Sequence, residues 1–371
     1  MDKLKSPSDK VLYQAIMEMK EPVVFQHMLQ NEKGEYCWKL LEWNLSELAE
    51  KFGDIKLPFR LGYNARSMTP QWEINCSIVS ITLSYFIQNM NLHEDHGQWF
   101  DIDKTGDDST LWIGSKGAHT NCHQDSYGCN LVAQIHGRKQ WLLFPPSSSN
   151  FLQPTRIPYE ESTIYSKYNF FCPTKEDEIN ILKIQDTARL VTLEPGDVLF
   201  VPPGWWHYVE SLELTVSVNI WLPIITDNIS RVKEAIVKLI MTRIGKDVNN
   251  VPNDTDCIDL LNIAIGECKT MTNVESSSGE IKRNIWTAKD LVTEYPIYVK
   301  LLRELSHTEL KEFLRMKRER FPEVYIESVK EDSKSHIDIQ NTYASQNLTE
   351  KVVNALCHPD VVNKVSELLL S

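Results

Sequence analysis

The pattern of apolar and polar positions changes near residue 110 and again near residue 223. Between these points, short apolar runs alternate with Gly, Pro and Asn, which is typical of many antiparallel strands. Residues 215–221 show this best, because apolar and polar side chains alternate from Val216 to Ile220, as on a strand with one face buried. The central part of the chain is therefore predicted to be mainly β.

Two pairs of these apolar runs are separated by short turns. Residues 130–135 and 139–144 flank a Gly-containing turn, and residues 189–193 and 198–201 flank a Pro-Gly turn. We predict that each pair forms a β-hairpin. Together with the alternating run that follows, they predict a jelly-roll barrel.

Helical spacing dominates the N-terminal flank, where two short strands interrupt it. Asn44 and Glu47 have the spacing of a capping box at the start of a helix that Gly53 ends,. The apolar spacing predicts helices at 9–20, 44–52 and 77–90 and strands at 23–25 and 58–61.

Helical spacing returns after residue 223. It predicts helices at 229–244, 258–264, 286–305 and 350–370, with polar flexible linkers at 269–283 and 328–346,. We therefore expect a mainly β core with helices (α+β), in three regions. These are N-terminal helices and strands that pack on the barrel (1–110), a jelly-roll core (111–226) and a helical C-terminal region (227–371).

Composition narrows the class of protein. Of the 371 residues, 42% are hydrophobic and 24% charged, which is ordinary for a soluble globular protein. The formal net charge of -12 argues against tight binding of nucleic acid, which depends on Lys and Arg. The eight Cys show no CxxC pair, which favours a reducing compartment. The sequence shows neither a signal peptide nor a run of about 18 apolar residues. We expect a cytoplasmic protein, with the nucleus as a second location, and no membrane partner.

The sequence His123-Gln-Asp125 is the sharpest local sign of chemistry. Side chains two residues apart on an extended chain project to the same side, so this imidazole and carboxylate can bind one ion. His207 follows a predicted strand, a Pro-Gly bend and two Trp residues, an arrangement that can aim its side chain into a barrel. Two His and one carboxylate leave coordination positions open, as non-haem Fe(II) oxygenases require. The alternative for His207 is a structural histidine packed against Trp205 and Trp206.

An oxygenase of this kind must also hold an anionic cosubstrate. A partly buried Lys139 would need an anion such as the distal carboxylate of 2-oxoglutarate, whereas a solvated Lys139 would not. Arg138 is the rival for this role, although alternation turns the two side chains to opposite faces. Asn130 and Asn219 lie in predicted strands and point either into the barrel or outward. Thr120 offers a hydroxyl close to the predicted metal ligands.

Two stretches resemble JmjC-domain oxygenases. Residues 112–146 resemble the central motif of that family, and residues 195–211 resemble its distal-histidine motif. The likeness extends over about residues 10–230, and the subgroup is similar to the asparaginyl hydroxylase that acts on hypoxia-inducible factor. The resemblance implies a double-stranded β-helix (jelly-roll, cupin/JmjC) that uses Fe(II), 2-oxoglutarate and O₂ to hydroxylate or demethylate a substrate.

The resemblance also assigns roles by position. It assigns the iron ligands to His123, Asp125 and His207. It assigns cosubstrate binding to Lys139, Thr120, Asn130 and Asn219. In this reading Lys139 pairs with the distal carboxylate of 2-oxoglutarate with help from Thr120, and the two Asn residues form hydrogen bonds around the cosubstrate and the metal.

The resemblance has consequences for partners as well. Residues 154–162 and 356–370 resemble a subgroup named for association with a small heat-shock protein, which implies such a protein as a partner. The acidic charge favours a protein substrate, although no residue pattern identifies it. The similar asparaginyl hydroxylase pairs two subunits through its C-terminal helices, which implies a homodimer here.

The sequence departs from the family in the segment 91–111, which is some 25 residues shorter than expected. In relatives that segment can supply a Tyr hydroxyl to the cosubstrate, and no such Tyr is found here. This leaves open a second reading, a JmjC barrel with little turnover that serves as a scaffold for a small heat-shock protein. A third is a non-oxygenase cupin that holds Zn or Mn.

Overall fold

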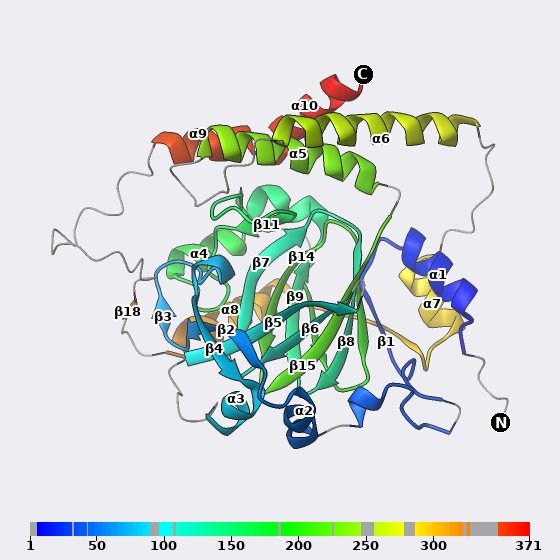
Figure 1. Cartoon of the computed structure of the whole chain (residues 1–371), viewed down its shortest axis with the longest axis vertical. Helices are drawn as coiled ribbons and strands as arrows, with labels where there is room; N and C mark the ends of the chain where they lie inside the picture. Colours follow the sequence, from blue (N-terminus) through cyan, green and yellow to red (C-terminus); the bar gives the residue numbers. More distant parts are fainter. Residues whose placement is uncertain are drawn as a thin grey trace.

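The computed structural model describes residues 6–31, 33–42, 44–89, 96–106, 109–184, 187–224, 226–245, 256–277, 286–321, 325–326 and 348–371. Two antiparallel sheets lie at its centre, and four helices cross one end of them (Figure 1). The predicted mainly β core with helices is confirmed.

The larger sheet has nine strands in the order β16-β1-β13-β8-β15-β6-β5-β2-β4. Its strands are β1 (Val23–Phe25), β2 (Lys56–Tyr63), β4 (Ser77–Thr82), β5 (His96–Gly106), β6 (Ser109–Gly114), β8 (Cys129–His136), β13 (Val198–Val201), β15 (Thr215–Leu222) and β16 (Val299–Leu301). The sheet thus includes strands from all three regions of the chain.

The smaller sheet has seven strands in the order β10-β11-β7-β14-β9-β12-β17. Its strands are β7 (His119–Asp125), β9 (Lys139–Phe144), β10 (Pro154–Thr155), β11 (Thr163–Ser166), β12 (Arg189–Leu193), β14 (Trp206–Ser211) and β17 (Arg303–Glu304). A short parallel pair, β3 (Arg66–Ser67) and β18 (Tyr325–Ile326), lies apart from both sheets.

Both predicted hairpins are wrong, although all four strands exist. β8 pairs with β13 and β15, whereas β9 pairs with β12 and β14 in the other sheet. Each short turn therefore carries the chain from one sheet to the other. Gly137 allows the first of these turns, because it has a φ of +63° and a Cβ there would lie 2.0 Å from the carbonyl oxygen of Leu214,.

Three helices belong to the N-terminal part and one follows β11. They are α1 (Asp9–Glu18), α2 (Leu45–Phe52), α3 (Leu83–Asn89) and α4 (Lys175–Ile181). The capping box of Asn44 and Glu47 at α2 is confirmed. The helix predicted over 77–90 is wrong for its first half, because β4 pairs with β2 along residues 77–82. Pairing with a neighbouring strand overrides the helical spacing there.

The C-terminal part contains six helices in its described residues. They are α5 (Asp227–Arg243), α6 (Cys257–Ser277), α7 (Ala288–Glu294), α8 (His307–Glu319), α9 (Leu348–Leu356) and α10 (Pro359–Leu370). The linker predicted at 269–283 is wrong up to Ser277, where α6 ends, and the one at 328–346 lies outside the described residues. The helix predicted over 286–305 ends at Glu294, because two strands follow it. β16 belongs to the larger sheet and β17 to the smaller sheet.

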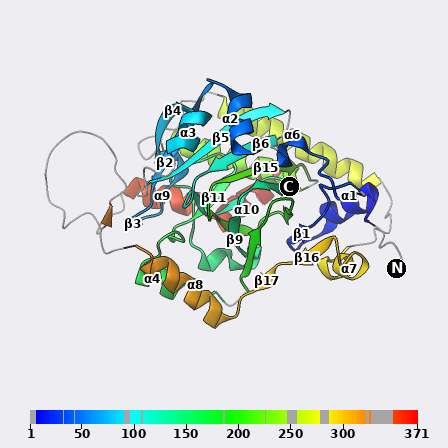
Figure 2. The same ribbon diagram turned by 90° about the horizontal axis from the view of Figure 1, so that it is seen from below.

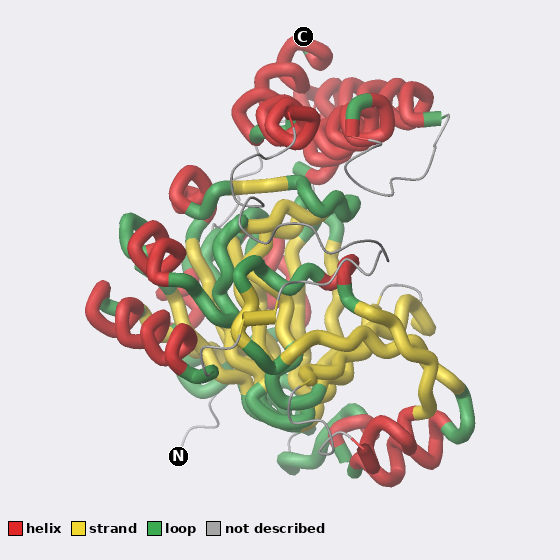
Figure 3. Tube along the Cα trace, turned by 90° about the vertical axis from the view of Figure 1, so that its left-hand side faces the viewer, coloured by secondary structure: helices red, strands yellow, loops and turns green. Residues whose placement is uncertain are grey.

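The sheets face each other across an apolar layer that includes Val132, Trp141, Leu193 and Leu199. Helices α4 and α8 cover the outer side of the smaller sheet, and α1 packs with α7 beside β1 (Figure 2). Helices α5, α6, α9 and α10 pack on one another at one end of the sheets (Figure 3). Within the described ranges, no helix combines the length and apolar character needed to cross a bilayer.

Candidate metal centre

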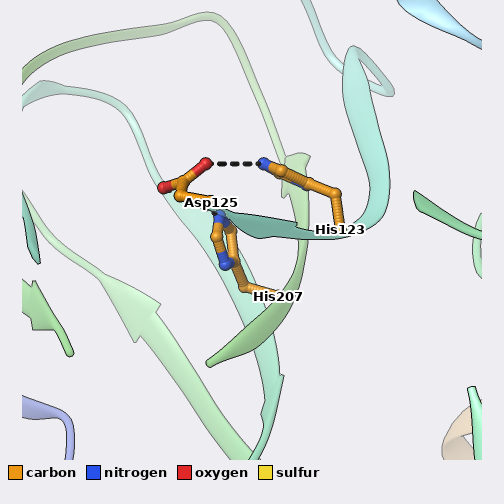
Figure 4. A group of neighbouring side chains, drawn as sticks. All are labelled: His123, Asp125 and His207. Atoms are coloured by element: carbon orange, nitrogen blue, oxygen red, sulfur yellow. Dashed lines mark ion pairs between the residues drawn. The ribbon is translucent and has the colours of Figure 1, made fainter. Parts of the chain in front are cut away.

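Neighbouring strands β7 and β14 bring three predicted residues together. His207 on β14 lies directly opposite His123 on β7 in the strand register. Asp125 follows two residues after His123, so both side chains point to the same side of β7. The intervening Gln124 points to the other side, where its amide donates to the carbonyl oxygen of Gly204. The two His residues and Asp125 therefore converge (Figure 4).

The distances are short enough for one ion to contact all three side chains. Nε2 of His123 lies 3.7 Å from Oδ1 of Asp125, and Nε2 of His207 lies 3.9 Å from Oδ2. One donor atom from each residue can be chosen so that all three lie within 4.8 Å of one another. This is the only such cluster of three His, Cys, Asp or Glu side chains in the described part of the chain.

Hydrogen bonds fix the tautomer of both imidazoles. Nδ1 of His123 donates to the carbonyl oxygen of Asn121 at 2.9 Å, and Nδ1 of His207 donates to that of Trp205 at 3.0 Å. Because a carbonyl oxygen only accepts, Nδ1 carries the proton in the neutral form of each ring, and Nε2 then has the lone pair. Burial lowers the pKa of His207 to about 4, and the neighbouring His123 adds to the effect. His207 is therefore neutral at physiological pH, as a metal ligand must be.

The carboxylate of Asp125 is also held in place. Its Oδ2 accepts from the indole Nε1 of Trp221 at 3.1 Å and from Nδ2 of Asn130 at 3.4 Å. These donors leave Oδ1 directed towards His123. The arrangement resembles the outer hydrogen bonds that orient ligands in metal sites.

All seven residues predicted for the site line one cavity of about 230 Å³. They are His123, Asp125, His207, Lys139, Thr120, Asn130 and Asn219. Asn130 and Asn219 are both buried, which decides their orientation in favour of the barrel interior. Oδ1 of each is buried without a hydrogen-bond partner among the described residues. A polar group bound in the cavity would satisfy these oxygens.

Lys139 and Arg138 point to opposite faces, as alternation along β9 requires. Lys139 is buried, and its Nζ donates to Oγ of Ser217 at 2.7 Å. Burial lowers its pKa to about 7, against the opposing influence of Glu73. The side chain of Arg138 is 47% exposed and pairs with Glu213 at 2.9 Å. Lys139 is therefore the cation inside the cavity.

Thr120 has a partner that the sequence did not predict. Its hydroxyl donates to Oε1 of Glu73 at 2.5 Å, and Nη1 of Arg60 pairs with Oε2 of Glu73 at 3.0 Å. Glu73 belongs to a 3₁₀ turn, Glu73–Asn75, that lies far from both sequence motifs. Burial raises the pKa of the Glu73 carboxyl group, and Arg60 opposes this. No local pattern around Glu73 distinguishes it from an exposed acid.

A tyrosine hydroxyl also lies in the wall of the cavity. Tyr165 on β11 stands opposite His123 in the register, and its hydroxyl donates to Glu160. Tyr165 does not belong to the segment 91–111, in which the sequence has no Tyr. Of that segment, residues 91–95 and 107–108 lie outside the described residues, and β5 and β6 occupy most of the remainder.

Comparison with known proteins agrees with this architecture. Residues 88–227 match the family described as cupin-like domain. Facing antiparallel sheets around a cavity are the architecture expected for such a domain. Residues 88–227 are therefore similar to a cupin-like domain in sequence and in architecture.

Several known proteins are similar in sequence to this chain. HSPB1-associated protein 1 of Homo sapiens is 39% identical over 264 residues, which cover 61% of this chain and 52% of that protein. The HSPB1-associated protein 1 homolog of Danio rerio is 37% identical over 267 residues, covering 61% and 57%. Lysine-specific demethylase JMJ31 of Arabidopsis thaliana is 37% identical over 111 residues, covering 30% and 20%. The chain spans about half the length of the HSPB1-associated proteins it matches.

Proposed function

We propose that the chain is an Fe(II)- and 2-oxoglutarate-dependent oxygenase that hydroxylates or demethylates a protein substrate. The observation that carries this proposal is the convergence of His123, Asp125 and His207 in one cavity, with Nδ1 of both imidazoles donating to backbone carbonyl oxygens. Two His and one carboxylate are the ligand set of non-haem Fe(II) oxygenases.

The residues present fit the metal and the cosubstrate. His123, Asp125 and His207 would hold Fe(II), and the metal with 2-oxoglutarate would supply the activation of O₂. Lys139 would bind the distal carboxylate of 2-oxoglutarate, since a buried ammonium group that has no ion-pair partner within 4 Å among the described residues needs an anion,. The unsatisfied amide oxygens of Asn130 and Asn219 would orient polar groups beside the metal.

The named relatives support the proposed partners. Some are called HSPB1-associated proteins and others lysine- or arginine-specific demethylases. We infer a protein substrate and a small heat-shock protein partner, in the cytoplasm and the nucleus. The C-terminal helices carry exposed apolar side chains, including Ile258, Ile263 and Leu368, and we infer that they pair two copies of the chain.

A second function is favoured by one observation. The hydroxyl of Thr120, which would assist cosubstrate binding, already donates to Glu73. A barrel that binds 2-oxoglutarate poorly would act as a scaffold for the small heat-shock protein with little turnover.

Anaerobic titration with Fe(II) and 2-oxoglutarate tests the oxygenase proposal. We expect a charge-transfer absorbance band in the wild type and succinate formation once O₂ is admitted. His123→Ala should lose both, because it removes one of three ligands. His136→Ala is the matched control, since His136 lies at the end of β8 outside the cavity. Succinate formation that survives in His123→Ala would refute the proposal, and a wild type that binds Fe(II) without turnover would favour the scaffold.

A further inference from the structure

The wall of the cavity contains a carboxylate belonging to the protein itself. Glu73 is only 7% exposed and lines the same cavity as Lys139 and the three proposed metal ligands. Its two oxygens are held separately, one by the hydroxyl of Thr120 and the other by the guanidinium of Arg60. The Glu73 carboxylate is therefore fixed rather than free to leave the cavity.

Glu73 accepts from one of the groups that a bound dicarboxylate would need, and its charge acts on another. Thr120 can donate its single hydroxyl proton to only one acceptor at a time. The negative charge of Glu73 also acts on the ammonium of Lys139 and favours its protonated form. Lys139 and Thr120 line both this cavity and a second, smaller cavity, so they lie where the two cavities meet.

We propose that Glu73 is a specificity-determining residue that competes with the distal carboxylate of the cosubstrate for Thr120 and Lys139. The proposal rests on the proposed function and names what limits cosubstrate affinity. Two carboxylates in one buried cavity repel each other, and the guanidinium of Arg60 offsets only part of this repulsion because it pairs with one oxygen of Glu73. The wild type should therefore gain little from the distal carboxylate of 2-oxoglutarate.

This predicts a specific pattern of ligand preference. The matched probe for 2-oxoglutarate is 2-oxopentanoate, which has the same chain length and keto acid group but no distal carboxylate. We expect the wild type to bind the two keto acids within about threefold of each other. Removing the Glu73 charge should favour 2-oxoglutarate alone.

The experiment is isothermal titration of the Fe(II)-loaded full chain with each keto acid under anaerobic conditions. For Glu73→Gln we expect at least tenfold tighter binding of 2-oxoglutarate and less than a threefold change for 2-oxopentanoate. Glu160→Gln is the matched control, because Glu160 lines the same cavity but accepts from Tyr165 rather than Thr120. It should change 2-oxoglutarate affinity by less than threefold.

A second variant, Thr120→Val, adds a measurement in the wild-type background that does not depend on the folding of Glu73→Gln. If Glu73 already occupies the Thr120 hydroxyl, Thr120→Val should weaken 2-oxoglutarate binding by less than threefold in the wild-type background. In the Glu73→Gln background the same change should weaken it by at least fivefold. Fe(II) affinity and thermal midpoint, measured alongside, show that each variant remains folded and loaded.

The outcomes separate this inference from the proposed function. Tight, selective binding of 2-oxoglutarate by the wild type, unchanged in Glu73→Gln, would overturn the role of Glu73 and leave the oxygenase proposal intact. A tenfold loss from Thr120→Val alone would do the same. If the Fe(II)-loaded wild type and Glu73→Gln both fail to bind either keto acid, both proposals fail.

Discussion

Replacing Lys139 with Met should change the pH dependence of stability in a characteristic way. The buried ammonium has its pKa lowered from 10.5 to about 7, chiefly by desolvation. At about 1.4 kcal/mol for each pH unit, keeping this charge buried costs the folded protein a maximum of about 5 kcal/mol at and below pH 7.

The direction of the pH dependence follows from the number of protons that the folded and unfolded states bind. Between pH 7 and pH 10.5 the unfolded chain keeps the Lys139 proton while the folded protein has released it. The unfolded state therefore binds more protons, and stability rises with pH in this window. The advantage of Lys139→Met over the wild type should shrink from about 5 kcal/mol at pH 7 to about 1.4 kcal/mol at pH 9.5. Loss of the Ser217 hydrogen bond subtracts a further ~1 kcal/mol at every pH.

Urea unfolding of the metal-free protein at pH 6.5, 7.5, 8.5 and 9.5 measures the difference in stability between variant and wild type. Both proteins are measured in the same buffers. Comparing variant with wild type cancels the titration of the buried cysteines, which affects both proteins equally. The matched control is Lys116→Met, because Lys116 is exposed and should give a difference that does not vary with pH. A Lys139→Met difference that stays flat across the series would refute the reasoning.

Two further substitutions test one contact of the site and one buried ion pair outside it. Trp221→Phe removes the indole donor to Asp125, so we expect Fe(II) affinity to fall about tenfold with little change in stability; unchanged affinity in a metal titration would contradict the supporting role. Glu210→Gln removes a buried acid, with its pKa lowered to about 2, that pairs with Lys317 on α8. Breaking a buried pair should destabilise the protein by about 3–5 kcal/mol at pH 7. Because the lowered pKa supplies stability that disappears as pH falls from about 4.5 towards 2,, the loss measured by urea unfolding should shrink in acid.

The relative orientation of residues close together in sequence could be predicted from strand geometry. His123 and Asp125 are two apart on a strand, so their common direction follows from strand geometry alone. The same alternation correctly separates Lys139 from Arg138. Sheet membership could not be predicted, since alternation predicts a strand but not its partner.

Glu73 illustrates the other limit of the sequence. It reaches the cavity only because a 3₁₀ turn from the N-terminal part lies against strands that come much later in the chain. Its neighbours in sequence do not carry the chemistry of the site; its neighbours in space, Thr120 and Arg60, do. A buried acid of this kind becomes visible only once tertiary contacts are known.

The edge of the larger sheet limits how the chain can be shortened. β13 pairs with β1, and β1 pairs with β16. Residues 23–25 therefore form hydrogen bonds with the outer strand of the core, and residues 299–301 form hydrogen bonds with residues 23–25. A fragment cut to residues 111–226 would expose the hydrogen-bonding groups of Val198–Val201 along an apolar strand. Unpaired strand edges of this kind recruit other chains. Such a fragment is expected to self-associate, so the β core is best studied with both flanking regions attached.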